Sequence, residues 1–561
     1  MSVCIIHTDI VSVYISSYMG RLRFTLTNII FWVVILLSCL LAENIAIFSE
    51  TPQSGFETLP LYLLSFGIIA LLIFYYVLEH KRNGLTMDKI LLPCLGVFGL
   101  LMIITIFRQG DRTFTNWDAT DTFSISFTFS ERLLASLQVV IWMMVLYAIV
   151  FVYNRFRLNN NSYRWIPKIY LLLTIAFVIF DFFYEIETIS GIFNGTYLGD
   201  GVQFVLGNSN VWALVIFCAI LSALILSYKR FNWYYFASMI CLFCYLIMTT
   251  SATAIYIGLV VVLAYPLFEV FVPFKDDKKK FLKRLLIYIG AVLTVFAVFA
   301  ICISANVPLF ANFWRFVDAD ILHKDFLTIT GRTDIWSHII DLLKQNPMDF
   351  IFGLGHQTGS QIFQTYNAEY MPVKSAHNAV MEVFLRYGLL GVIVYVMMLG
   401  LIIFALALHV KKKRHRLAFI YGLAFLAVLA HSIAESTNIF TPNIGGTYLG
   451  LYFALPILNT LQNKKFKELK DDLSSVNVKK EKVPELFYIF MVVYICVSIL
   501  ITKVIYNFTN IDLFSCLVIC VLLAMSGLFV LSILNNKSLN KVNENIFNHY
   551  LRRLEVIKDE K

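Results

Sequence analysis

Residues Gly331–Gly391 read GRTDIWSHIIDLLKQNPMDFIFGLGHQTGSQIFQTYNAEYMPVKSAHNAVMEVFLRYGLLG, and they carry charged and hydrogen-bonding side chains in a quantity that most of the chain lacks. Arg332 opens an amphipathic segment, and His377 and Asn378 stand directly before a long apolar run. A polar stretch beside apolar runs predicts a loop at a membrane face. We interpret this one as a catalytic loop.

The composition outside this stretch is that of a membrane protein. Of the 561 residues, 59% are hydrophobic and 14% are charged, whereas soluble domains have roughly 45–50% apolar and about 25% charged residues. Apolar runs of about 18 residues or more recur, which predicts membrane-spanning helices. No small-residue cleavage site follows the first run before Glu43, so we interpret it as a helix and not as a signal peptide. We therefore expect an all-α integral membrane protein.

The apolar runs predict about fourteen transmembrane helices. Their centres fall near residues 34, 69, 99, 143, 176, 219, 241, 262, 294, 399, 426, 454, 495 and 523. The expected organisation is nine spans in 1–304, an extracytoplasmic catalytic loop with short amphipathic helices in 305–387, three spans in 388–461, a cytoplasmic linker in 462–485, two spans in 486–534 and a cytoplasmic tail in 535–561.

The distribution of basic residues predicts the orientation. With the N-terminus inside, 35 of the 45 lysines and arginines fall in the segments expected in the cytoplasm. The opposite orientation would translocate basic clusters such as Lys278–Lys280 and Lys411–Arg414, which the positive-inside rule disfavours. We expect a multi-pass protein of the cytoplasmic membrane with both termini inside. The net charge of +9 then reports orientation and does not indicate nucleic acid.

Two segments on the predicted outer side carry most of the polar chemistry. The loop Arg108–Arg132 has enough charged residues to line a substrate groove, although a solvated connector explains them as well. The loop 305–375 is longer than most connections, which are functional or disordered beyond roughly 12–15 residues. Its many aromatic and aliphatic residues give it the apolar surface needed to pack.

A helix is predicted directly after Gly331. Thr333 or Asp334 can cap it, and Asn346-Pro347 ends it. Its apolar residues recur at helical spacing: Ile335, Trp336, Ile339, Ile340 and Leu343. Arg332 lies at the N-terminal end, where unpaired amides and the helix dipole add to its positive field. This is an expected anion site; the alternative is an ion pair of Arg332 with a local carboxylate such as Asp318, Asp320 or Asp334.

A second helix is predicted from Ala376 to about Tyr387, with His377 in its first turn. Glu382 and Arg386 are spaced for an i,i+4 ion pair. A lone histidine is often only a hydrogen-bonded structural residue, but a neutral imidazole can also accept a proton from a hydroxyl. Both readings of His377 stay open from the residues alone.

The pair Asp318-Ala319-Asp320 raises a rival chemistry. Two carboxylates at this spacing can hold a divalent metal against a phosphate. Such pairs also arise by chance. Magnesium or manganese dependence would favour the aspartates.

Together these residues resemble the O-antigen ligase and Wzy-type polysaccharide polymerase superfamily. The resemblance covers roughly residues 170–460. It rests on Gly331–Trp336, on Gly353-Leu354-Gly355, on His377-Asn378 followed by Gly388 and Gly391, and more weakly on Gly207–Asn210.

The resemblance implies a GT-C-like membrane glycosyltransferase that works without cofactor or metal. Arg332 would bind the diphosphate of a polyprenyl-linked glycan donor, His377 would orient or deprotonate the hydroxyl of a glycan or lipid-linked acceptor, and Asn378 would contact substrate. Membrane lipid is a further partner, with a chain-length regulator or a flippase as a candidate protein partner and no nucleic acid.

One element departs from the family pattern. Many relatives have a Ser-Arg-Gly-like step at the outer end of the seventh span, where this chain has Ser251-Ala252-Thr253. A second diphosphate-binding cation must then come from elsewhere. The candidates are Arg315, which we favour, and Lys324, Lys374, Arg108 and Arg112.

The leading function is polymerisation of polyprenyl-diphosphate-linked repeat units into a capsule, an exopolysaccharide or an O-antigen-like chain. A ligase that transfers a finished glycan is the alternative within the same class. A flippase is the alternative from another class, but transporters usually place charges at the bilayer midplane. Charged residues inside the predicted spans are few here, and Asp181, near an outer end, is one of them.

Overall fold

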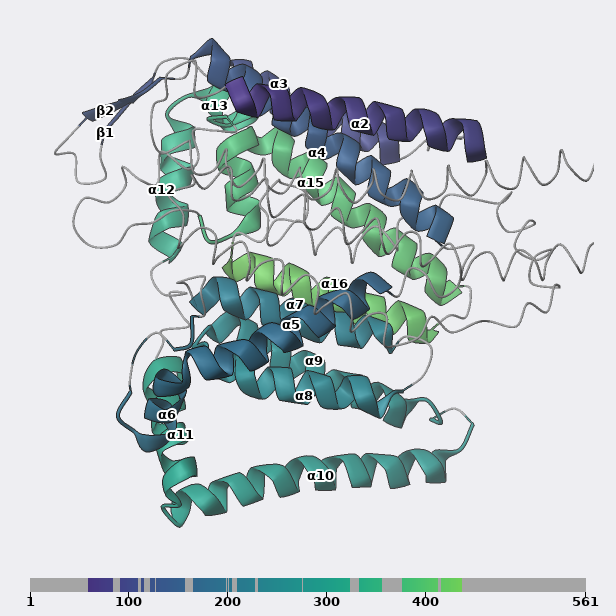
Figure 1. Ribbon diagram of the computed structural model, residues 1–561, viewed down its shortest axis with the longest axis vertical. Coiled ribbons are helices and arrows are strands. Elements are labelled where there is room, and N and C mark those ends of the chain that lie inside the picture. The colour runs from purple at the N-terminus through teal and green to yellow at the C-terminus, as the bar shows by residue number, and fades with distance from the viewer. Residues whose placement is uncertain are drawn as a thin grey trace, which may run out of the picture. The chain divides into compact units, whose positions relative to one another are not determined.

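The structure, a computed structural model, is built almost wholly of helices (Figure 1). It describes residues 59–83, 91–108, 112–115, 122–126, 128–156, 165–197, 199, 201–203, 209–227, 231–274, 276–322, 332–355, 376–411 and 415–435. The chain divides into two compact units, one formed by residues 1–96, 136–160 and 462–561 and the other by residues 97–135 and 161–461.

The described part of the first unit contains α2 (Leu59–Asn83), the start of α3 (Leu91–Arg108) and most of α4 (Phe129–Phe156). Tyr76 of α2 donates a hydrogen bond from its hydroxyl to the carbonyl of Met144 in α4 at 2.5 Å. The ring of Tyr76 also lies 5.9 Å from that of Tyr147. Aromatic contacts therefore join α2 to α4.

The second unit contains the remaining helices. These are α5 (Trp165–Tyr184), α6 (Ile186–Asn194), α7 (Ser209–Leu226), α8 (Trp233–Ile247), α9 (Ala252–Phe271), α10 (Lys278–Ser304), α11 (Pro308–Val317), the π-helix η3 (Asp318–Leu322), α12 (Arg332–Lys344), α13 (Pro347–Phe352), α15 (Ala379–Lys411) and α16 (His415–Ala434). Every predicted span centre from 69 to 426 falls inside a helix, whereas those near 34, 454, 495 and 523 lie outside the described residues.

Five of the described helices, α7, α9, α10, α15 and α16, are long and apolar enough to cross a membrane. Several others are apolar but shorter over their described side chains. The chain is thus a multi-pass membrane protein.

Helix α7 lies at the centre of this unit and is buried over most of its length, against α5, α8, α9 and α16. A buried carboxylate joins three of these helices. Asp181 of α5 accepts hydrogen bonds from the indole of Trp212 in α7 at 2.9 Å and from the hydroxyl of Tyr245 in α8 at 2.5 Å. The charged residue noted within the predicted spans therefore has a structural place in the bundle.

Helix α10 has the opposite character, because none of its residues is buried. It is attached to α9 by two polar contacts: Tyr288 donates to the carbonyl of Leu263 at 3.0 Å, and Arg284 donates to that of Glu269 at 3.0 Å. Beyond Arg284 its exposed side chains are mostly apolar, which suits a helix in contact with lipid.

The loop after α3 departs from the all-α expectation. Residues Arg112–Thr115 form strand β1 and residues Thr122–Ile125 form strand β2, paired antiparallel with Arg112 opposite Ile125. Thr, Phe and Ile dominate both strands, and these residue types favour extended backbone. Hydropathy predicts spans and says nothing of short strands between them, so a hairpin was not expected.

The helix predicted after Gly331 is confirmed as α12. Its apolar face packs on the beginning of α15, in a cluster that includes Ile335, Ile339 and Leu385. The chain then turns into α13, where the side chain of Asn346 accepts the backbone N–H of Met348 at 3.0 Å as an N-cap. The described part of the loop around α12 and α13 is therefore packed, as its apolar content predicts.

Two glycines let α13 and α15 approach each other. Gly353 and Gly388 both have positive φ angles, 76° and 63°. A Cβ on Gly388 would lie 2.3 Å from the carbonyl oxygen of Ile351, and one on Gly353 would lie 2.4 Å from the backbone of Arg386. Because Gly388 is non-helical, it separates a short first segment of α15 from the apolar segment that follows.

Candidate active site

Arg332 lies at the N-terminal end of α12, as predicted, and its guanidinium forms an ion pair. The prediction that Thr333 or Asp334 caps this helix was wrong, because both residues lie inside it. The Nη2 atom of Arg332 lies 3.0 Å from Oε1 of Glu435, the residue directly after α16. The Arg332 side chain is 14% exposed and that of Glu435 is 17% exposed. Two helix ends that are far apart in sequence therefore meet at this pair.

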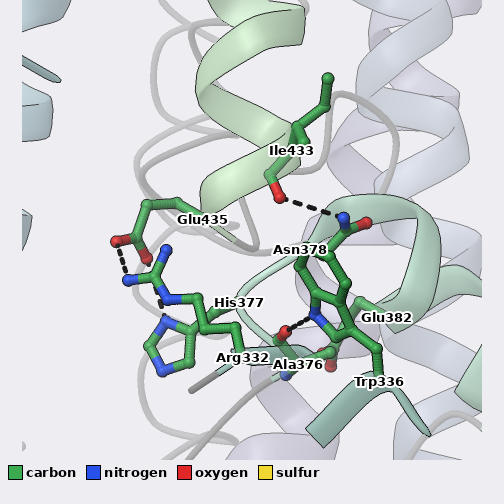
Figure 2. Close-up of polar contacts among 8 residues, drawn as sticks. All are labelled: Arg332, Trp336, Ala376, His377, Asn378, Glu382, Ile433 and Glu435. Carbon is green, nitrogen blue, oxygen red and sulfur yellow. Dashed lines mark hydrogen bonds and ion pairs between the residues drawn. The ribbon is translucent and has the colours of Figure 1, made fainter. Parts of the chain in front are cut away.

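His377 binds the other oxygen of the same carboxylate. Its Nδ1 lies 3.1 Å from Oε2 of Glu435. Figure 2 shows the guanidinium and the imidazole gathered on one side of Glu435. The structure thus brings together the two residues predicted to do the chemistry.

The backbone of His377 is strained, with a φ angle of 47°. Histidine adopts this left-handed region uncommonly, and such strain persists only where the surroundings enforce it. Here they do so through Ala376: its carbonyl accepts the indole N–H of Trp336 at 2.9 Å, and its N–H donates to Glu382 at 3.0 Å (Figure 2). Both polar backbone groups on the N-terminal side of the histidine are fixed.

Asn378 fixes the chain on the other side. Its Oδ1 accepts the backbone N–H groups of Val380 and Met381 at 2.9 and 3.1 Å, so Asn378 is the N-cap of α15. Its Nδ2 donates to the carbonyl of Ile433 in α16 at 3.0 Å. These bonds give Asn378 a structural role, which holds the start of α15 against the end of α16; contact with substrate stays a prediction.

The predicted pair of Glu382 and Arg386 is confirmed. Nε of Arg386 lies 2.8 Å from Oε1 of Glu382, and Nη2 lies 2.5 Å from the same oxygen. Glu382 is 4% exposed, so its charge depends on this partner far more than a surface pair would. Its other oxygen accepts the N–H of Ala376.

The charges around Glu435 keep it ionised. Burial raises the pKa of Glu435, but the hydrogen bond from His377 and the charge of Arg332 outweigh burial, so that pKa lies below its ordinary value. His431, one turn earlier on α16, acts in the same direction. The site therefore holds a carboxylate between a permanent cation and an imidazole.

The chain matches one known family, described as O-antigen ligase, over residues 201–396. Over these residues the chain is similar to that family. The matched residues make up about a third of the chain and include Arg332 and His377. No curated protein and no solved structure matches the chain.

Within the matched region, the favoured second cation lies apart from Arg332. Arg315 is an exposed residue of α11, which packs against α6, α10 and η3 and lies apart from α12 in Figure 1. Lys324 and Lys374 lie outside the described residues. Substrate contacts of these three residues remain predictions.

Arg108 and Arg112 precede the matched region and are placed differently from Arg315. Arg108 ends α3 and forms an ion pair with Asp349 of α13, with a further bond to the carbonyl of Met348 at 2.8 Å. It thus supports the loop that packs on α15. Arg112 lies in β1, and its side chain is outside the described part of the structure.

The local alternatives for Arg332 named the wrong partner, because its observed carboxylate is Glu435 rather than Asp318, Asp320 or Asp334. Asp318 begins η3, and the side chain of Asp320 is not described. Sequence reasoning gave Glu435 no role. The available signal was its position, since it is the first charged residue after an apolar run that ends on the same side as His377.

Proposed function

We propose that the chain is a membrane glycosyltransferase that polymerises polyprenyl-diphosphate-linked oligosaccharide repeat units into a cell-surface polysaccharide. The observation that supports the transferase chemistry best is the meeting of Arg332 and His377 on the carboxylate of Glu435. A cation for a diphosphate and a base for a hydroxyl are the two groups that such a transfer needs.

In the proposed reaction, an acceptor hydroxyl attacks the anomeric carbon of the donor glycan. A new C–O glycosidic bond forms, and the bond between the anomeric carbon and the phosphate oxygen breaks. The electron pair of that bond leaves with the polyprenyl diphosphate. The hydroxyl proton passes to Nε2 of His377, the nitrogen that does not bond to Glu435.

Arg332 would bind the donor diphosphate and stabilise the charge that grows on it as it leaves. Guanidinium presents a planar fork of N–H donors that suits phosphate oxygens. Arg332 also begins α12, whose first backbone N–H groups and dipole favour an anion at that end. The diphosphate is already a good leaving group, so positioning of donor and acceptor supplies much of the acceleration.

Ligation is the alternative within the same chemistry. The description of the matched family as O-antigen ligase favours it. A polymerase uses a second lipid-linked glycan as acceptor, so its product can react again, whereas a ligase transfers a finished glycan once to a different acceptor. The two therefore differ in the products they form.

A flippase is the alternative from another class. Transporters usually bind substrate near the bilayer midplane between broken helices. The ion pairs of Glu435 and Glu382 instead lie at the beginning of α12 and α15 and at the end of α16. We infer that this end faces the extracytoplasmic side, in agreement with the distribution of basic residues.

The test is reconstitution in lipid vesicles with a purified lipid-linked repeat unit. A ladder of products supports the polymerase, a single transfer to an added acceptor supports the ligase, and translocation without new glycosidic bonds supports the flippase. Chelator with and without added magnesium tests the rival role of Asp318 and Asp320.

The variants Arg332→Ala and His377→Ala test whether these two residues are required for activity. Lys344→Ala and His415→Ala are matched controls, since Lys344 ends the same α12 and is exposed, and His415 is an exposed histidine at the start of α16. Activity should be lost in the first pair and retained in the second. Full activity of both Arg332→Ala and His377→Ala would refute the proposed site.

A further inference from the structure

Glu435 uses its two carboxylate oxygens for two different partners. Oε1 pairs with Arg332 at 3.0 Å, and Oε2 pairs with His377 at 3.1 Å. The residue lies 39 positions beyond the end of the O-antigen ligase match at 396, so the match assigns it no role. Its backbone N–H donates to the carbonyl of His431 at 2.9 Å, which continues the hydrogen bonding of α16 and fixes where the carboxylate stands.

We propose that Glu435 is a positioning residue that orients His377 as a base and occupies Arg332 until the donor diphosphate displaces it. This inference rests on the proposed function, but its second half, the displacement of Glu435 from Arg332 by diphosphate, concerns binding alone. It can therefore be tested whether or not the protein proves to be a transferase.

The first half follows from the pairing of Oε2 with Nδ1. An ionised carboxylate only accepts hydrogen bonds, so the proton of a neutral imidazole must lie on Nδ1. Nε2 is then the nitrogen with a lone pair, and the acceptor hydroxyl gives its proton there. The same carboxylate stabilises the imidazolium that forms, because opposite charges lie in contact away from bulk water.

The second half follows from the pairing of Oε1 with Arg332. A diphosphate carries more negative charge than one carboxylate and matches the guanidinium fork equally well. It can therefore replace Glu435 on Arg332, and Glu435 then acts on His377 alone. Among the described residues, those that act on the Glu435 carboxylate are Arg332, His377 and His431, and none of them is an acid.

The consequence is a division between binding and turnover. Glu435→Gln keeps the size of the side chain but removes the charge that competes for Arg332, and an amide cannot stabilise an imidazolium as a carboxylate does. Donor binding should therefore become tighter by roughly fivefold, the value of a modest ion pair. Turnover should fall by about 10²-fold or more, the usual contribution of an oriented base.

The experiment measures both quantities on the full chain in detergent. Binding is measured by titration with a polyprenyl diphosphate that carries no glycan, and kcat and KM are measured with the lipid-linked repeat unit. The variants are Glu435→Gln, Glu435→Asp, which keeps the charge, and Arg332→Ala. Glu187→Gln, an exposed glutamate of α6, is the matched control. Thermal unfolding verifies that each variant is folded.

The expected result is tighter diphosphate binding and lower kcat in Glu435→Gln, weaker binding in Arg332→Ala, and intermediate kcat in Glu435→Asp. Unchanged or weaker diphosphate binding in folded Glu435→Gln would overturn the exchange, that is, the replacement of Glu435 by diphosphate on Arg332. Tighter binding with unchanged kcat would overturn the orienting role. If the unaltered protein forms no glycosidic bond but Glu435→Gln still binds diphosphate more tightly, the proposed function fails and the exchange stands.

Discussion

The Nδ1 atom of His377 lies 3.1 Å from Oε2 of Glu435, although 58 positions separate the two residues in the sequence. The contact joins the beginning of α15 to the end of α16. It also gives the imidazole a partner outside its own helix, so the orientation of His377 depends on how these two helices pack. Substitutions that alter that packing should therefore affect catalysis.

Replacement of Arg332 should affect binding and turnover together. We expect Arg332→Ala to lower kcat/KM by roughly 10²–10³-fold, the usual cost of removing one donor that stabilises a developing negative charge. Arg332→Lys should recover part of the loss, because it keeps the charge but not the planar fork. The measurement is transfer from a lipid-linked donor at several donor concentrations. An equal loss of kcat/KM in Lys344→Ala would show that positive charge on α12 matters, and not Arg332 in particular.

Replacement of Trp336 tests whether the strained His377 is fixed from the N-terminal side. Trp336→Phe keeps an aromatic ring but removes the N–H that binds the carbonyl of Ala376, a fully buried residue. A buried acceptor without a partner costs about 1–3 kcal/mol. We expect a lower thermal midpoint in detergent and a lower kcat with little change in KM. Trp314→Phe, on α11, is the control, and the same result in both variants would argue against the specific bond.

Two glycines of α15 should respond in opposite ways to alanine. At Gly388 the positive φ angle alone costs alanine about 1–3 kcal/mol, and the new Cβ would clash with the backbone at Ile351. At Gly400 no atom lies within 4 Å of an added Cβ, and a helical alanine is favoured by roughly 0.5–1 kcal/mol. Thermal unfolding should show a large loss for Gly388→Ala and none for Gly400→Ala. A stable Gly388→Ala would contradict the close approach.

The ion pairs of Glu435 predict a dependence of stability on pH. Because the pKa of Glu435 is lowered in the folded protein, its carboxylate contributes stability that is complete above the ordinary pKa of 4.5 and disappears as the pH falls through the lower folded value. The measurement is the difference in thermal midpoint between the unaltered protein and Glu435→Gln from pH 6 to pH 3. The difference should shrink only below about pH 4.5. Disappearance of the difference already at pH 6 would contradict the lowered pKa.

Local patterns in the sequence were sufficient for the helices and for part of the site. Apolar runs located α2 to α5, α7 to α10, α15 and α16, and the spacing of Ile335, Ile339 and Leu343 located α12. The helical spacing after His377 located α15, but the prediction that His377 lies in its first turn was wrong, because the helix begins at Ala379 and Asn378 is its N-cap. In each case the interactions that decide the structure lie within one or two turns of the chain.

The rest of the site depends on contacts between distant segments, which a single sequence does not report. Nothing near Arg332 indicates Glu435, because the pair forms only when the end of α16 packs beside α12. In the same way, Gly353 and Gly388 are visible as glycines, but their mutual approach is a property of the packed backbone. Arg315 was favoured for its charge, and its distance from α12 follows from the position of α11.

The position of Glu435 also bears on how the protein is made. Synthesis proceeds from the N-terminus, so Arg332 enters the membrane environment 103 residues before its partner. A nascent chain that has reached His377 still lacks the acid that both residues share. The ion-pair cluster is therefore assembled only once α16 has been inserted, and polypeptides released before that stage lack the carboxylate that pairs with Arg332 and His377.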